Sequence, residues 1–189
     1  RRPPRSTLFP YSTLFRSVVE KKKIVSGASI KKGDVIVALA SSGLHSNGFS
    51  LARKALSLAE QKSLSHALLK PTTIYVDPVL KALERFNIKG MAHVTGGAFV
   101  EKMTKILPKG KCFAIDRASW IVPKIFQIIQ SKGNIADKEM FTTFNMGVGF
   151  VLVVDKAQAP SLVKFFTQRS VSSWILGSVI DHRQKRILL

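Results

Sequence analysis

The strongest constraint on the fold is an alternation that begins at Val18, in which short apolar runs of strand length are followed by longer stretches with apolar residues at helical spacing. This alternation is typical of domains in which helices cover a sheet. We therefore expect an α+β domain, α/β-like, with a mixed sheet flanked by helices. Strands are expected at residues 34–40, 91–94, 112–115 and 148–154, with closing strands on an edge or hairpin at 174–180 and 186–189. Helices are expected at residues 49–59, 74–86, 123–130 and 159–168, and a further helix follows the glycine pair at 96–97 and runs through residue 106.

Composition narrows the class of protein. The chain has 189 residues, 46% of them hydrophobic and 22% charged, which suits a single globular domain. The longest apolar run, residues 146–154, is far shorter than the roughly 18 residues of a membrane span, so no membrane contact is expected. Cys112 is the only cysteine, which excludes an internal disulfide, favours a buried structural thiol and suggests a reducing cytoplasm.

The charge balance is strongly basic, with 30 Lys and Arg against 11 Asp and Glu, a formal net charge of +19. Such a charge attracts polyanions without naming one. The lysine runs at 21–23 and 31–32 lack interleaved aromatic residues on which bases could stack, so a solvated basic surface is favoured over nucleic-acid binding. A basic nucleic-acid module is kept as an alternative, and it predicts binding that weakens steeply with salt.

Residues 1–17 differ from the rest of the chain. They repeat the tetrapeptide STLF, contain four arginines and have no acidic residue. A basic targeting peptide is one interpretation, although no methionine begins it. We favour the interpretation that this segment is non-native and adapter-like, or disordered, and that the domain comprises residues 18–189.

A polar loop with two glycines, SSGLHSNGFS, follows the expected strand at 34–40. Loops at the carboxyl ends of strands in such sheets face the ligand crevice. The loop displays His45 and Asn47 between Gly43 and Gly48, and an imidazole there can transfer a proton or stabilise a developing negative charge. A well-formed turn is the structural alternative, but this combination favours a functional site.

A second motif, HVTGGAFVEK, begins at His93. Thr95 can cap the helix that follows, while the backbone amides of Gly96 and Gly97 can bind an anion such as phosphate. Paired glycines before a helix are also common as plain turns, and His93 is interpreted equally as a packed or a catalytic residue.

A third motif, FNMGVGF, places Asn145, Gly147 and Gly149 at the start of the most apolar expected strand. Glycine within a strand indicates a bulge or the close approach of another group. The sequence shows neither a metal-ligand cluster at a recognised spacing nor a nucleophile with its base and orienting group.

Four segments in register carry a family resemblance: GDVIVALASSGLHSNGFSLARKAL, LLKPTTIYVDPVL, MAHVTGGAFVEKMTKILPK and MFTTFNMGVGF. Together they resemble phosphoribosylformylglycinamidine cyclo-ligase, also called aminoimidazole ribonucleotide synthetase, over residues 18–189. The resemblance implies the C-terminal domain of that superfamily. It also implies that ATP phosphorylates the amide oxygen of formylglycinamidine ribonucleotide, after which ring closure gives aminoimidazole ribonucleotide, ADP and phosphate.

The resemblance also assigns roles to residues. His45 matches the histidine that acts at the reacting amide, by charge stabilisation or proton transfer. Ala98 stands where the family has a third glycine, and Met146 where a cysteine is more familiar. The residues expected to bind substrate or phosphate are Ser42, Asn47, Gly48, Thr95, Gly96, Gly97, Asn145 and Gly147.

In this family most ATP and Mg²⁺ ligands and the main homodimer contact lie on an N-terminal domain that precedes the resembling region. The resemblance therefore implies that these residues alone do not turn over substrate. Other ATP-dependent members of the superfamily, formylglycinamidine ribonucleotide synthetase, selenophosphate synthetase and thiamine-phosphate kinase, are alternatives. The Ser-x-Leu-His-Ser-Asn-Gly motif favours the cyclo-ligase.

Overall fold

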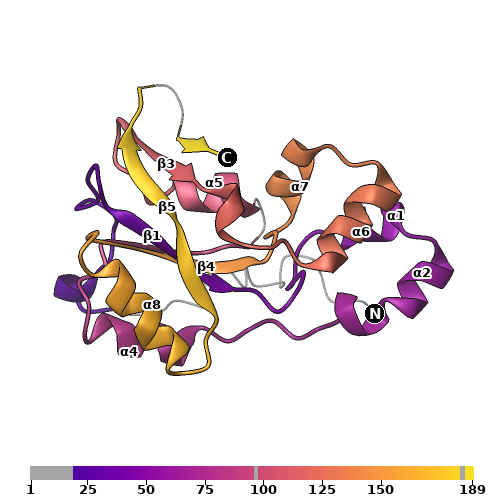
Figure 1. The fold of residues 1–189 in the computed structure, drawn as a ribbon, viewed down its shortest axis with the longest axis horizontal. Coiled ribbons are helices and arrows are strands. Elements are labelled where there is room, and N and C mark those ends of the chain that lie inside the picture. Colours follow the sequence, from indigo (N-terminus) through magenta and orange to yellow (C-terminus); the bar gives the residue numbers. More distant parts are fainter. Residues whose placement is uncertain (1–18, 96–97, 184–185) are drawn as a thin grey trace, which may run out of the picture.

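The computed structural model describes residues 19–95, 98–183 and 186–189, and the prediction for residues 1–17 lies outside them. One mixed six-stranded sheet with the order β2-β4-β1-β5-β3-β6 organises the chain (Figure 1). All neighbouring strands are antiparallel except β3 and β6, which are parallel. The strands are β1 (Val35–Ala40), β2 (Gly90–His93), β3 (Lys111–Ile115), β4 (Val148–Val154), β5 (Ser173–Asp181) and β6 (Ile187–Leu188).

The expected mixed sheet is confirmed, but the position of one strand was predicted wrongly. The strand expected at 174–180 was assigned to an edge or hairpin, whereas β5 lies inside the sheet between β1 and β3. The first part of its nine residues pairs with β1 and the last part with β3, and the short β6 forms the edge instead. A sequence run shows that a strand is apolar, but not which strands it will pair with.

Strand β1 divides the hydrophobic core in two. Successive side chains of a strand point to opposite faces, so Val35, Val37 and Leu39 enter one cluster while Ile36 and Ala38 enter the other. All five are buried. Because β1 is covered on both faces and bonded on both sides, its ends are fixed in position, and the loop that follows Ala40 starts from a rigid support.

Helices cover both faces of the sheet (Figure 1). On one face, α4 (Val76–Leu83) and α8 (Ala159–Thr167) lie side by side over the Val35 cluster. The other face is covered by α1 (Phe49–Ala55), α5 (Ala98–Thr104), α6 (Lys124–Gly133) and α7 (Asp137–Thr143). The remaining elements are α2 (Leu58–Ser63), α3 (Ser65–Leu68) and the 3₁₀ helices η3 (Lys21–Lys23) and η4 (Arg117–Ser119).

The single helix expected at 49–59 is instead two helices, α1 and α2. Ser57 separates them, because its side chain accepts the backbone N–H of Glu60 while the Glu60 carboxylate accepts the N–H of Ser57. This reciprocal capping box begins a new helix. Within the part of the chain that the structure describes, no helix combines the length and apolar character needed to cross a membrane.

Candidate functional site

The loop after β1 is held in place by a buried side chain from the turn before β4. The Asn145 Oδ1 atom accepts hydrogen bonds from Ser41 Oγ and from the Gly147 N–H, both at 2.9 Å. Its Nδ2 atom donates to the carbonyl of Gly43 at 2.8 Å. The Ser41 N–H in turn donates to the Gly147 carbonyl. The first and third sequence motifs therefore form one structural unit.

His45 lies inside this loop with left-handed backbone geometry, at φ 59°. A non-glycine residue adopts this geometry rarely, and it turns the imidazole inward. The side chain is only 5% exposed. Its Nε2 atom accepts the N–H of Ser42 at 3.1 Å and faces the N–H of Thr73 at a longer 3.5 Å.

The protonation state of His45 follows from these contacts. Burial, with a smaller contribution from nearby His93, lowers the pKa of His45 to about 4, so the ring is neutral at pH 7. Since Nε2 accepts hydrogen bonds, the single proton of the neutral ring belongs on Nδ1. Nδ1 is buried and has no hydrogen-bond partner among the described residues. The loop therefore holds one N–H donor without an acceptor.

Two aromatic side chains, those of Tyr75 and His93, lie beside the His45 ring. Tyr75 lies 6.0 Å away between ring centroids and His93 6.2 Å away, and Phe150 contacts both of these residues. His93 is exposed and stacks on Phe150 at 6.0 Å, and its contact with the rings removes part of its water and lowers its pKa. The Tyr75 hydroxyl donates to the Ala40 carbonyl at 2.7 Å.

The structure brings four of the predicted site residues together, namely Ser42, His45, Asn145 and Gly147. Asn145 was expected to bind substrate or phosphate, but it is 3% exposed and both ends of its amide are used inside the protein. These contacts hold the loop, and binding of substrate or phosphate by Asn145 stays a prediction.

The remaining predicted residues lie around this unit. Gly48, at φ 81°, precedes α1, and a side chain there would meet the Phe144 ring at 2.2 Å, so it serves packing. Asn47 is half-buried, and its side chain makes no hydrogen bond within the described part of the chain. Thr95 is half-buried next to Val94, whose N–H donates to the Gly149 carbonyl. The predictions for Gly96 and Gly97 lie outside the described residues.

Tyr75 and Gly149 were not predicted as site residues. Nothing in the local sequence marks Tyr75, because its contact with Ala40 spans 35 positions of the chain. Gly149 had been noted only as a glycine within a strand. Such a glycine indicates a close approach, and the approaching groups are Tyr75 and His45.

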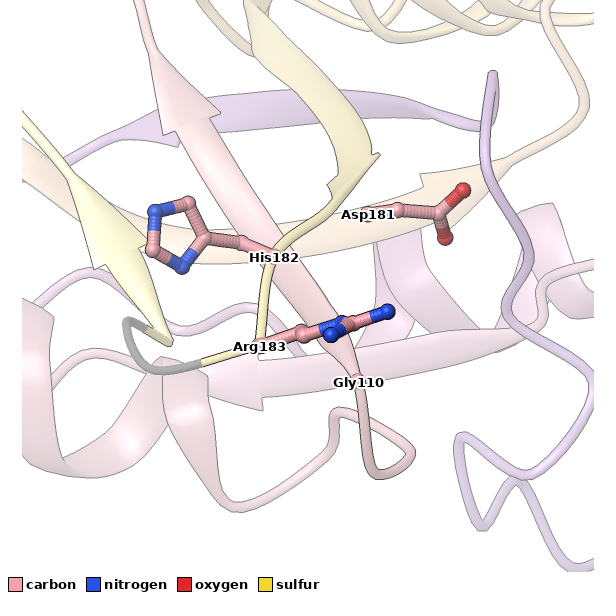
Figure 2. Close-up of a pocket in the computed structure, with 4 residues that line it drawn as sticks. All are labelled: Gly110, Asp181, His182 and Arg183. Atoms are coloured by element: carbon pink, nitrogen blue, oxygen red, sulfur yellow. The ribbon is translucent and has the colours of Figure 1, made fainter.

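A separate hollow of about 690 Å³ lies at the opposite end of β5, between Gly110 and residues 181–183 (Figure 2). Figure 2 shows Asp181 and His182 pointing to opposite sides of the strand end. The Asp181 carboxylate contacts Lys111 at 2.5 Å and Lys32 at 3.7 Å, and these lysines lower its pKa. This hollow offers no unpaired carboxylate, and no group of three His, Cys, Asp or Glu able to hold a metal occurs among the described residues.

The chain is similar to a known protein family and to curated proteins. Residues 31–189 match the family model described as AIR synthase related protein, C-terminal domain. The chain is 45% identical over 174 residues to a phosphoribosylformylglycinamidine cyclo-ligase of Caldicellulosiruptor bescii, covering 86% of this chain and 51% of the relative. A cyclo-ligase of Methanococcus maripaludis is 45% identical over 175 residues, covering 87% and 49%. The chain spans about half the length of the curated relatives it matches.

Solved structures share the fold at low sequence identity. Escherichia coli HypE, a hydrogenase maturation protein, aligns with a TM-score of 0.60 and 17% identity, over 85% of this chain and 48% of that one. Phosphoribosylformylglycinamidine synthase II of Thermotoga maritima aligns with a TM-score of 0.59 and 12% identity, over 90% and 26%. These similarities confirm the fold class.

Proposed function

The chain belongs to the AIR synthase related protein family, whose C-terminal domain it contains, and from this premise we propose that it contributes His45 to the site of an ATP-dependent cyclo-ligase. The proposed reaction converts formylglycinamidine ribonucleotide to aminoimidazole ribonucleotide, ADP and phosphate. Relatives of about 45% identity with this name favour it over the other reactions of the superfamily.

The observation that carries the proposal is the unpartnered Nδ1 atom of His45. A donor held in a fixed position stabilises negative charge that develops on a substrate oxygen without reorganising during the reaction. ATP supplies the phosphoryl group that activates the amide oxygen of the substrate. His45 then donates a hydrogen bond to that oxygen, and the low pKa of the ring favours this role over proton transfer, because little imidazolium exists at pH 7.

Other residues of the site keep His45 available. The N–H groups of Ser42 and Thr73 orient the ring, and Asn145 holds the loop closed. Substrate or phosphate contacts by Ser42, Asn47, Gly48, Thr95, Gly96, Gly97, Asn145 and Gly147 remain predictions. Because the described residues contain no cluster suited to Mg²⁺, no step is assigned to a metal held by them.

The proposal includes a cytoplasmic location and a homodimer in the whole enzyme. The nucleic-acid alternative rests on the net charge of +19 alone. It would gain support only if the purified chain bound RNA with an affinity that fell steeply as salt was raised.

The test is a chimera in which residues 18–189 replace the corresponding half of the Caldicellulosiruptor bescii cyclo-ligase. We expect ATP-dependent formation of aminoimidazole ribonucleotide by the chimera. His45→Ala should lower kcat by roughly 10²- to 10³-fold, the usual effect of removing one such donor. His66→Ala, which removes an exposed imidazole on α3, is the matched control and should leave kcat unchanged. A folded chimera in which His45→Ala keeps full activity contradicts the proposal.

A further inference from the structure

The segment before α4 crosses the His45 loop and is fastened to it at two points. The Ser42 hydroxyl donates to the Pro71 carbonyl at 2.6 Å. Four residues later along the chain, the Tyr75 hydroxyl donates to the Ala40 carbonyl at 2.7 Å. Both anchors are side chain to backbone hydrogen bonds, and both end on residues at the carboxyl end of β1 or directly after it.

The residue between these two anchors contacts the catalytic ring. The Thr73 N–H faces Nε2 of His45 at 3.5 Å, the outer limit of a hydrogen bond, whereas the Ser42 N–H lies at 3.1 Å. A contact of this length is kept only if the segment on both sides is held. Tyr75 lies two residues after Thr73, so its hydrogen bond to Ala40 fastens the segment on one side of this contact.

Gly149 supplies an independent observation. A Cβ atom built on it would lie 1.8 Å from the Tyr75 hydroxyl oxygen and 2.9 Å from Cε1 of His45. Gly149 is within β4 and is not among the residues with positive φ, so space rather than backbone conformation requires glycine there. The side chains of Tyr75 and His45 therefore both pack directly against the backbone of β4 at Gly149.

We propose that Tyr75 is a positioning residue that, seated on Gly149, keeps Nε2 of His45 an acceptor and so fixes the ring proton on Nδ1. This inference rests on the proposed function, in which Nδ1–H is the group that meets the substrate. Tyr75 touches no reacting atom itself. Burial raises its pKa to about 12, so its hydroxyl stays protonated and remains a donor to Ala40.

The test reads the tautomer directly by long-range ¹H–¹⁵N NMR at pH 7 on the full 189-residue chain labelled with ¹⁵N-histidine. The chain has four histidines, and the resonances lost in His45→Gln identify those of His45. The unsubstituted chain should show Nδ1 protonated. In Tyr75→Phe, which keeps the aromatic ring, the ratio of the Nε2–H to the Nδ1–H form should rise by roughly three- to tenfold, as the loss of one hydrogen bond predicts.

Two control variants separate positioning from general loosening. Thr142→Val removes another hydroxyl that donates to a backbone carbonyl at 2.7 Å, on α7. Gly149→Ala should shift the ratio as Tyr75→Phe does. Gly90→Ala should not, because its Cβ would meet the Ile30 side chain at 2.7 Å and the end of the Ile106 side chain at 3.3 Å, and neither belongs to the His45 loop.

Unchanged tautomer ratios in both Tyr75→Phe and Gly149→Ala would overturn the inference, as would equal shifts in the two controls. Chimera activity is read separately. If the tautomer shifts as expected while the chimera makes no aminoimidazole ribonucleotide, the proposed function is refuted and the positioning of His45 by Tyr75 stands.

Discussion

The two ends of the central strand β1 differ in whether their buried polar groups have partners. At the Asp34 end, the ammonium of Lys89 lies 2.7 Å from Asp34 and 2.6 Å from Asp155, and the Lys31 N–H also donates to Asp34. At the Ala40 end, the imidazole of His45 is equally buried, yet its Nδ1 atom has no partner among the described residues.

Backbone strain differs between the two ends. His45 and Met146, both non-glycine residues with positive φ, flank the Ala40 end, whereas beside Asp34 the positive φ falls on a glycine, Gly33. Strained backbone and an unsatisfied donor both lower stability, and their occurrence together at this end is consistent with the site proposed for His45. At the other end, by contrast, the buried charges are paired with one another.

The largest effect is expected from Lys89→Met. It leaves Asp34, which is 1% exposed, buried without a counter-ion, so the free energy of unfolding should fall by about 3–5 kcal/mol in urea titrations. Lys81→Met, which breaks an exposed pair with Asp77 of 3.0 Å, should cost at most about 1 kcal/mol. Equal losses for the two variants would mean that the buried pair at the Asp34 end stabilises the fold no more than an exposed pair does.

Asn145→Ala tests whether the Ala40 end contains structural polar groups as well. It deletes the partners of Ser41, Gly43 and Gly147, and we expect unfolding measured by urea to become easier by about 2–3 kcal/mol. Asn87→Ala, at an exposed position, should change stability by less than about 0.5 kcal/mol. Full stability combined with weakened substrate binding by the chimera would reassign Asn145 as a ligand residue.

A smaller effect is expected from acid. The pKa of His45 is about 4 when folded and near 6.5 when unfolded, so between these values the unfolded chain binds more protons and stability falls as pH falls. From pH 7 to pH 5 the loss should be about 1–2 kcal/mol. His93, whose pKa is also lowered, adds in the same direction.

The carboxylate of Asp155 at the other end loses its contribution only below its unfolded pKa of 3.8, outside this range. Urea titrations at pH 7 and pH 5 should therefore show that the free energy of unfolding depends less steeply on pH in His45→Gln than in the unsubstituted chain. An identical slope would mean that His45 does not titrate in this range.

Much of the fold was predictable because apolar runs report burial directly. The run at 148–154 coincides with β4, and that at 34–40 differs from β1 by one residue. The helix α7 was not predicted, since its seven residues include Asp137, Lys138 and Glu139 and give little apolar period. The place of β5 inside the sheet depended on pairings that local sequence does not contain.

The site was predictable only in part. A histidine between two glycines after a buried strand identified the His45 loop. The amide of Asn145 was expected to face a ligand, because nothing in its surroundings indicated that Ser41, 104 positions away, would use it. Tyr75 lay in an expected helix and remained unnoticed for the same reason.

The pairing of β1 with strands far along the chain also sets the order in which the site forms during synthesis. Its hydrogen-bonding partners, β4 and β5, are translated long after β1, and such distant pairings close slowly. A nascent chain that has not yet reached Asn145 therefore displays the His45 loop without its support. His45 is translated before Asn145, so its ring acquires its orientation only after Asn145 has been added to the chain.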